Sequence, residues 1–229
     1  MESHKMSRKN RRLLIISCVI TFFIVVYFGC GITGICSVYK ISTSACEPKY
    51  EVGERIFSSN LKTIQKGEFV CYTDLSGEVY TSQLIAMEGE LLEIKNNIAY
   101  INGSLADDTM KLKFAWIVED PEGMDMATFF AKYPGGYFSA NPDGKGGNLI
   151  NLTINEGQTM GYKRWCFEKG VSDKSVWMGA QNNWNRDWFG PFTIPKGYVF
   201  LLSPNRANAY DSRYRGPIEM KNIVAVNLN

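Results

Sequence analysis

The sequence has very little histidine: His4 is the single histidine among 229 residues, and it lies in a charged N-terminal tail. This scarcity excludes catalysis by a serine or cysteine that a neighbouring histidine activates, and it excludes zinc sites built on histidine. The six cysteines form no C-x-x-C motif, so neither dithiol redox catalysis nor an all-cysteine zinc site is expected. We therefore expect no metal and no cofactor.

An excess of one charge sign is also missing. Lys and Arg total 25 and Asp and Glu total 23, which gives a formal charge of +2. Nucleic-acid-binding domains usually carry a strongly basic surface, so we do not expect nucleic acid as a partner. The chain is 45% hydrophobic and 21% charged. This composition supports a packed core and excludes disorder of the whole chain.

Long apolar runs are absent from most of the chain, but one lies near its start. Residues 13–32 form 20 residues without a charge, which is long enough to cross a bilayer as a helix. Residues 1–12 hold five bases and one acid, so the positive-inside rule keeps them cytoplasmic. We expect a single-pass anchor in a bacterial inner membrane, a periplasmic or otherwise extracytoplasmic domain, and the lipid bilayer as a partner. A cleaved signal peptide is the alternative, but the run is long for one and no Ala-x-Ala site follows.

Four cysteines fall in the part that we expect to be exported: Cys36, Cys46, Cys71 and Cys166. In an oxidising compartment these cysteines can form disulfides. Four cysteines allow three pairings, and the sequence does not choose among them.

The chain after residue 36 has the pattern of strands separated by turns. Runs rich in β-forming residues predict strands at 69–72, 79–85, 198–202 and 223–226. A hairpin is predicted to join 91–95 to 98–101, because Asn96-Asn97 tolerates the positive φ values of a tight turn. No long segment in this part has a helical period. The predicted fold class is mainly β, with one N-terminal transmembrane helix.

Residues 106–190 differ in composition from the rest. We predict that they form an inserted loop-rich subdomain, and that residues 37–105 and 191–229 form the β core. A turn-rich run begins at Asn141, but it has neither the spacing of a phosphate loop nor the bidentate glutamate of a calcium loop, which favours a solvated loop. All five tryptophans lie in this region, and we expect them to anchor core and loops rather than to stack on bases. They are Trp116, Trp165, Trp177, Trp184 and Trp188.

The most specific motif covers residues 204–218, with the sequence PNRANAYDSRYRGPI. It resembles the C-terminal box of type I signal peptidases and their conjugative-transfer relatives, Asn-Arg-x-x-Ser-x-Asp-Ser-Arg-Tyr-x-Gly. Upstream, Pro48 and Gly53 have the spacing of the family's Ser-Met-x-Pro box and the Gly-Asp that follows it. Residues 66–70 and 83–90 resemble two further boxes. The insertion carries no motif of this family.

The resemblance implies a β scaffold at the membrane surface that uses a serine nucleophile and a lysine general base. Such a lysine must be desolvated, because a protonated ammonium cannot accept the proton of the serine. By the family's spacing the nucleophile falls on Ala45, the base on Ser82 and a supporting serine on Ala209. None of the three residues carries the required group, so the resemblance implies a substituted active site.

Other positions of the motifs are retained. Thr43 falls where the family has a hydroxyl that lines the oxyanion hole, and Asp211 and Arg213 match a pair that supports the site and can form a charge-assisted hydrogen bond. Ser44 and Cys46 flank the empty nucleophile position and are fallback nucleophiles. Some conjugative relatives have Ser-x-Pro, a register that puts Cys46 on the nucleophile, but no base is assigned to it.

Three functions follow as hypotheses. The first is a non-catalytic protein that binds a peptide, pre-protein or pilin segment by strand addition and works with subunits of a secretion or conjugation apparatus. The second is an active membrane-bound serine or cysteine endopeptidase that processes signal peptides or pilin precursors. The third is a structural subunit that binds through the tryptophan-rich insertion. The missing lysine at Ser82 favours the first hypothesis, because a relocated nucleophile would still have no base.

Overall fold

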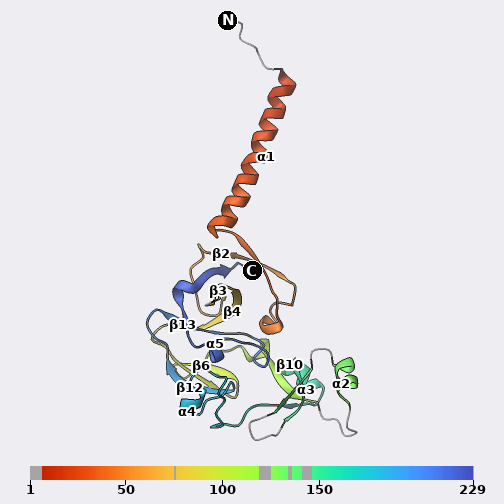
Figure 1. Cartoon of the computed structure of the whole chain (residues 1–229), viewed down its shortest axis with the longest axis vertical. Coiled ribbons are helices and arrows are strands. Elements are labelled where there is room, and N and C mark those ends of the chain that lie inside the picture. The colour runs from red at the N-terminus through yellow and green to blue at the C-terminus, as the bar shows by residue number, and fades with distance from the viewer. Residues whose placement is uncertain (1–6, 75, 119–124, 134–135, 141–145, 229) are drawn as a thin grey trace.

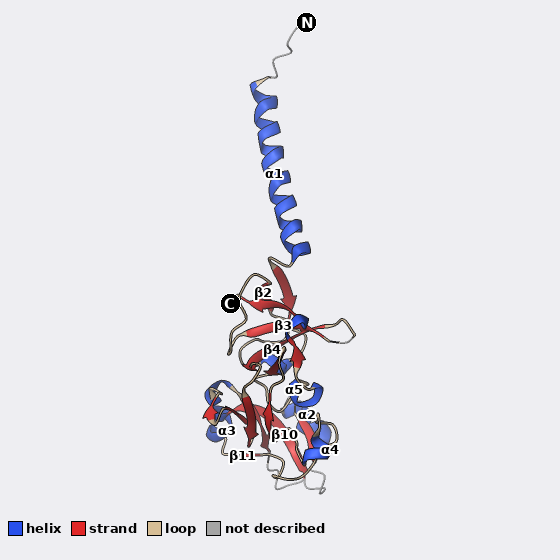
Figure 2. Ribbon diagram, turned by 90° about the vertical axis from the view of Figure 1, so that its left-hand side faces the viewer, coloured by secondary structure: helices blue, strands red, loops and turns tan. Residues whose placement is uncertain are grey.

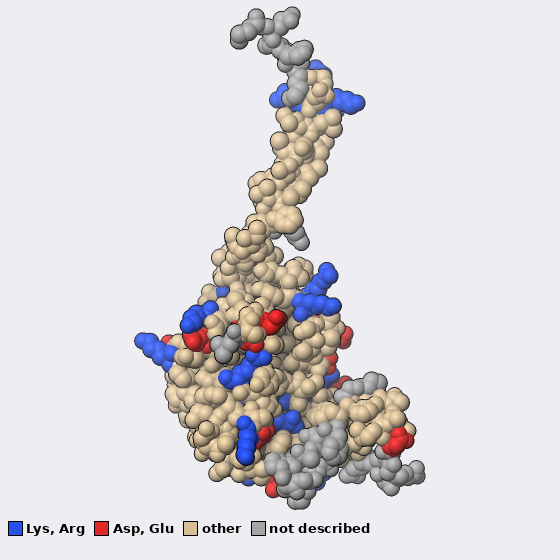
Figure 3. All heavy atoms as spheres, viewed as in Figure 1, with Lys and Arg blue, Asp and Glu red and all other residues tan. Residues whose placement is uncertain are grey.

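A long N-terminal helix projects from a β-rich body in the computed structural model, which describes residues 7–74, 76–118, 125–133, 136–140 and 146–228 (Figure 1). Helix α1 (Arg8–Thr33) begins where Ser7 Oγ accepts a hydrogen bond from Asn10 N at 3.3 Å, and it ends at Gly34, whose φ is 73°. The helix is long and apolar enough to cross a membrane, and its large apolar side chains are exposed. Charged side chains gather at its N-terminal end and are missing along its length (Figure 3). The predicted span at 13–32 lies within this helix.

The largest sheet has seven strands and joins the two ends of the chain. Its C-terminal strand lies between two early strands, so residues far apart in sequence complete one sheet. Four strands predicted from the sequence are confirmed as β3, β4, β13 and β15. The order is β1 (Ser37–Lys40), β2 (Arg55–Ser59), β15 (Ile223–Asn227), β3 (Phe69–Thr73), β4 (Val79–Ala86), β13 (Tyr198–Leu202) and β14 (Ile218–Glu219).

A four-stranded sheet contains the predicted hairpin. Asn96 and Asn97 form its turn with φ values of 51° and 66°, as the two asparagines predict. The order is β12 (Trp188–Thr193), β5 (Leu91–Lys95), β6 (Ile98–Ile101) and β7 (Ser104–Leu105), so β7 is an edge strand.

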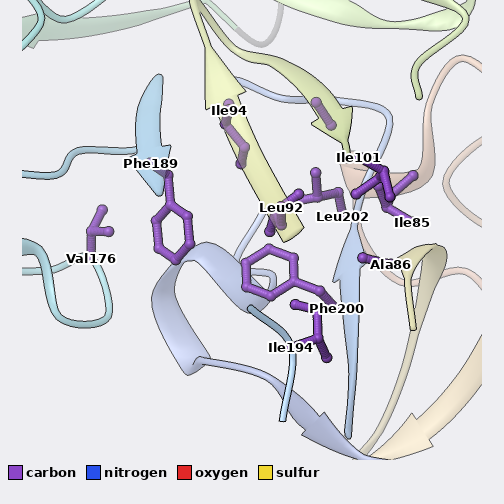
Figure 4. Close-up of a cluster of buried hydrophobic side chains, with 11 residues drawn as sticks. Ile85, Ala86, Leu92, Ile94, Ile101, Val176, Phe189, Ile194, Phe200 and Leu202 are labelled. Carbon is purple, nitrogen blue, oxygen red and sulfur yellow. The ribbon is translucent and has the colours of Figure 1, made fainter. Parts of the chain in front are cut away.

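An apolar core fixes this sheet against the seven-stranded one (Figure 4). Leu92 from β5 and Phe200 from β13 are fully buried in it, and the rings of Phe189 and Phe200 lie with centroids 5.4 Å apart. Burying one such side chain contributes roughly 1.5–3 kcal/mol. The core therefore holds the end of β13 in a fixed place, and the residues that follow β13 form part of the site described below.

Residues 113–164 contain a third sheet that the sequence patterns did not predict. It lies at the end of the body away from α1 (Figure 2). The first strand residues of β10 are Gly146 and Gly147, which weaken the local strand signal. The sheet has the order β11 (Lys163–Arg164), β8 (Lys113–Ile117), β10 (Gly146–Thr153) and β9 (Tyr137–Ala140). The division into a core and an insertion at residues 106 and 190 stays a prediction.

Two tryptophans of this region are buried, and the other three, Trp177, Trp184 and Trp188, are half-buried. Trp116 is 4% exposed and Trp165 is 7% exposed, so both anchor the core as expected. Trp177 and Trp184 pack against the core around Phe189. Residues 141–145 of the turn-rich run lie outside the described residues.

The helices of the body are short in the described part of the chain, which agrees with the absence of a helical period there. They are α2 (Met126–Lys132), α3 (Ile154–Thr159), α4 (Gly179–Asn182), α5 (Ser212–Arg215) and the 3-10 turns η1 (Ser44–Cys46), η2 (Thr109–Lys111) and η3 (Met220–Asn222).

Candidate functional site

A cleft of about 670 Å³ brings the predicted site segments together. One wall is formed by residues 40–46, which include η1, and the opposite wall by residues 79–81 at the start of β4. Residues 207–210 of the C-terminal motif and Ser203 complete the lining. Segments that lie up to 170 residues apart in the sequence therefore line one cleft, as the motif resemblance predicts.

Strand residues without a neighbour border the cleft: Lys40 at the end of β1 lies on one side and the start of β4 on the other. β1 is the first strand of its sheet, and β4 pairs with β13 only from Gln83 onward, which leaves residues 79–82 unpaired on that side. The carbonyl of Thr81 accepts a hydrogen bond from Cys46 Sγ at 3.3 Å, so it points toward the cleft. The N–H of a strand residue points to the same side as its carbonyl, so Thr81 N–H also faces the cleft. The cleft therefore offers backbone groups to an extended peptide.

Backbone hydrogen bonds hold the predicted nucleophile position, Ala45, which carries no nucleophile. Ala45 presents a methyl group, and its N–H donates to Thr43 Oγ1 at 3.4 Å. Its carbonyl accepts from Asn205 N at 3.0 Å, which fastens η1 to the C-terminal motif. The hydroxyl of Ser44 accepts from Asn208 Nδ2 at 2.9 Å. Ala209 also lines the cleft and supplies a methyl where the family has a hydroxyl.

At the predicted general-base position, Ser82, two hydroxyls are hydrogen-bonded to each other. Ser82 is 1% exposed, and its Oγ lies 2.6 Å from Ser203 Oγ. Each hydroxyl can donate to or accept from the other, so the pair is satisfied without an amine. In the described part of the chain, Lys40 is the one lysine that lines the cleft, and it lies on β1 rather than at the base position.

The fallback thiol of Cys46 is held in its protonated form. Cys46 is 3% exposed, and burial, followed by the nearby Cys71, raises the pKa of its thiol to about 12. Burial also raises the pKa of Cys71. Because the thiolate is the reactive species, this environment opposes nucleophilic attack by either residue. The described cysteines form no disulfide; they are Cys18, Cys36, Cys46, Cys71 and Cys166.

Asp211 and Arg213 form a buried ion pair behind the cleft. Arg213 Nε donates to Asp211 Oδ1 and Nη2 donates to Oδ2, both at 2.9 Å. Burial acts to lower the pKa of Arg213, but the Asp211 carboxylate outweighs it, so the pKa is raised. Asp211 Oδ2 also accepts from Ser203 N at 3.1 Å, while Arg213 Nη1 donates to Asn97 Oδ1 at 3.0 Å. The pair therefore links the base position to the hairpin turn of the second sheet.

A second buried ion pair, between Arg206 and Asp107, was not predicted. Asp107 Oδ1 accepts from Arg206 Nη2, and its Oδ2 accepts from Ala99 N at 2.7 Å. Arg206 belongs to the C-terminal motif, so the motif signals the arginine. The lone Asp107 lies 99 residues away and has no local pattern that marks it. Ser203 and Asn97 were missed for the same reason.

Comparisons with known proteins agree with these motifs. The family model for signal peptidase, peptidase S26, matches residues 13–228. The chain is 23% identical over 192 residues to signal peptidase I V of Bacillus subtilis (strain 168), which covers 82% of this chain and 81% of that protein. It is 24% identical over 180 residues to signal peptidase I of Bacillus amyloliquefaciens, covering 76% of this chain but only 62% of that relative's length. The crystal structure of a signal peptidase I from Enterococcus faecalis V583 matches with 18% identity and a TM-score of 0.36, over 73% of this chain and 98% of that one.

Replacing Arg213 should destabilise the whole body. Arg213→Ala leaves Asp211 buried without its partner, and we expect the free energy of unfolding to fall by about 3–5 kcal/mol. Lys221→Ala is the matched control, because it removes the exposed pair with Glu219, and it should leave the melting temperature nearly unchanged. Thermal unfolding in detergent micelles, followed by circular dichroism, measures both. Equal melting temperatures for the two variants would contradict the structural role of the pair.

Cys46 should resist alkylation in the folded protein. With a pKa of about 12, about one thiol in ten thousand is ionised at pH 8. Cys36 is exposed and should react with iodoacetamide far faster. Mass spectrometry of variants that keep only one of these two cysteines gives the two rates, and the Cys46 rate should still be rising with pH above pH 10. Comparable rates at pH 8 would show an accessible, activated Cys46.

Proposed function

Because the chain belongs to the signal peptidase family, peptidase S26, we propose that it is a non-catalytic member of that family. It binds an extended peptide segment of a pre-protein or pilin in the cleft and leaves the peptide bond intact. The observation that carries this proposal is the buried hydrogen bond between Ser82 and Ser203, which fills the position of the general base.

Hydrolysis by this family's chemistry needs a nucleophile and a base that accepts its proton. Ala45 supplies no nucleophile, and a serine hydroxyl at position 82 is too weak a base to replace an amine. In another serine protease, loss of the nucleophile alone lowers kcat by about 10⁶. A loss of that size, combined with the missing base, leaves no useful turnover.

The active-endopeptidase hypothesis requires a displaced nucleophile, and neither candidate is favourable. The Ser44 hydroxyl is engaged by Asn208, and the Cys46 thiol is buried and protonated. The hypothesis of a structural subunit is not favoured either, because Trp116 and Trp165 lie inside the insertion rather than on its surface. Peptide binding is the hypothesis that agrees with the features present in the site, namely the cleft and the unpaired backbone groups along it.

What the site retains suits recognition of an extended chain. The unpaired start of β4 offers backbone groups to the cleft, and Lys40 at the end of the edge strand β1 lines its other side. A peptide that adds as a strand gains affinity from main-chain hydrogen bonds and specificity from pockets for alternate side chains. The Asp211–Arg213 pair and the contacts of η1 keep these edges in place.

We place this cleft on the outer face of a bacterial inner membrane. Helix α1 is a candidate span, and Arg8, Lys9, Arg11 and Arg12 at its start favour a cytoplasmic N-terminus. A peptide partner would then be a polypeptide that emerges from the membrane. The assignment to secretion or conjugation, and to a pilin as a partner, rests on the resemblance to conjugative-transfer relatives.

Strand addition predicts that Thr81 N–H contributes to binding. Thr81→Pro removes this cleft-facing donor, whereas Thr81→Val keeps it and preserves the shape of the side chain. Fluorescence anisotropy of full-length protein in detergent micelles, with a labelled peptide that covers the signal-peptide end of a pre-protein, measures the affinity. We expect Thr81→Pro to weaken binding about fivefold, since one hydrogen bond contributes about 1 kcal/mol, and Thr81→Val to have little effect. Equal affinities for the two variants, with equal melting temperatures, would argue against strand addition.

A further inference from the structure

A groove of about 880 Å³, larger than the cleft, lies next to it and is used by none of the chemistry described above. Its lining is apolar at several positions, and four lysines line it as well: Lys49, Lys62, Lys66 and Lys111. We call it the lysine-lined groove. Its apolar lining includes Phe69, Leu84, Ile85, Ile101, Leu105 and Leu112.

The groove and the cleft are lined by neighbouring residues of the same chain segments. On β4, Thr81 lines the cleft and Gln83 lines the groove, and residues two apart in a strand lie on the same face. After β13, Ser203 lines the cleft and its neighbour Pro204 lines the groove. A ligand that extends out of the cleft along this face would therefore enter the groove.

The polar groups of the groove are nearly balanced in charge. Lys62 pairs with Glu68 at 2.8 Å and Lys111 pairs with Asp108 at 3.0 Å, while Lys66 pairs with Glu90. A groove lined by neutralised pairs does not suit a strongly charged ligand such as a nucleic acid. It suits a polypeptide, whose backbone is polar and whose side chains are mixed.

One group remains available to such a ligand. In the described part of the chain the exposed Lys49 has no ion pair, and its ammonium lies 5.0 Å from the ring centroid of Tyr50. An acidic side chain of the ligand would pair with Lys49.

The edge of the second sheet borders the same groove. Strand β7 pairs with β6 on one side only, and its Leu105 is 58% exposed beside the apolar lining. An exposed leucine on an unpaired strand edge offers both an apolar contact and backbone groups to an extended segment.

We propose that the lysine-lined groove is a second peptide subsite, occupied by the continuation of the same polypeptide that the cleft holds. This inference rests on the proposed function, because only a protein that leaves the peptide bond intact keeps the two segments joined. Linking two weak contacts through one chain raises the affinity without any new contact in either site. The segment in the groove is extended and carries an acidic residue that pairs with Lys49.

The test compares two labelled peptides of a bacterial pre-protein on full-length protein in detergent micelles. The short peptide fills only the cleft, and the long peptide extends it at both ends and includes an acidic residue. We expect the long peptide to bind about tenfold more tightly. Lys49→Glu and Leu105→Asp should abolish this advantage and leave the affinity for the short peptide unchanged. Lys174→Glu, at an exposed lysine that lines neither hollow, is the matched control for charge and should preserve the advantage.

The outcomes separate this inference from the proposed function. Equal affinity for the two peptides, or equal effects of Lys49→Glu and Lys174→Glu, would overturn the second subsite while binding in the cleft still stands. Failure of both peptides to bind would overturn the proposed function and the second subsite together. Melting temperatures of all variants show whether a lost affinity reflects a lost fold.

Discussion

Arg213 and Asp211 form an ion pair in the interior of the protein, where neither side chain is more than 1% exposed. Removing such charges from water costs several kcal/mol per ion, and only good geometry with further hydrogen bonds offsets that cost. Here Asp211 also accepts from Ser203 N, and Arg213 also donates to Asn97 and to the carbonyl of Arg186. The pair thus fixes the end of β13 and the hairpin turn relative to each other. The shape of the cleft depends on it.

The residues at the predicted nucleophile, base and supporting positions are under no such constraint. Ala45 and Ala209 present only methyl groups to the cleft, and the Ser82 hydroxyl is satisfied by Ser203. A buried lysine or an unpaired hydroxyl at these positions would instead need partners, since buried polar groups are costly when unsatisfied. On the proposed function, the framework of the signal peptidase family persists around a site without its nucleophile or base. A cleft that keeps its shape without the catalytic side chains can still bind a peptide, which is the physical basis for the proposed binding role.

The sequence predicted the parts of the structure that local patterns determine. Runs rich in β-forming residues identified β3 and β4, and Asn96-Asn97 identified the hairpin, because strand composition and turn chemistry are local signals. The motif identified Asp211 and Arg213 as a pair. It did not identify Asn97, Asp107 or Ser203 as partners, because those contacts form between residues far apart in sequence. The sheet of β8 to β11 was not predicted, because its longest strand starts with two glycines. The burial that raises the pKa of the Cys46 thiol was not predicted either, because it depends on tertiary packing.

The central claim is that the cleft binds a polypeptide without cleaving it. The most direct measurement is a cleavage assay of the full-length protein in detergent micelles, with pre-protein and pilin-precursor substrates and an active signal peptidase as the positive control. Ser44→Ala and Cys46→Ala variants run in parallel, and mass spectrometry detects the products. The account predicts intact substrate with the wild-type protein and both variants while the control cleaves. Cleavage by the wild type that disappears in either variant would contradict the account and identify the displaced nucleophile.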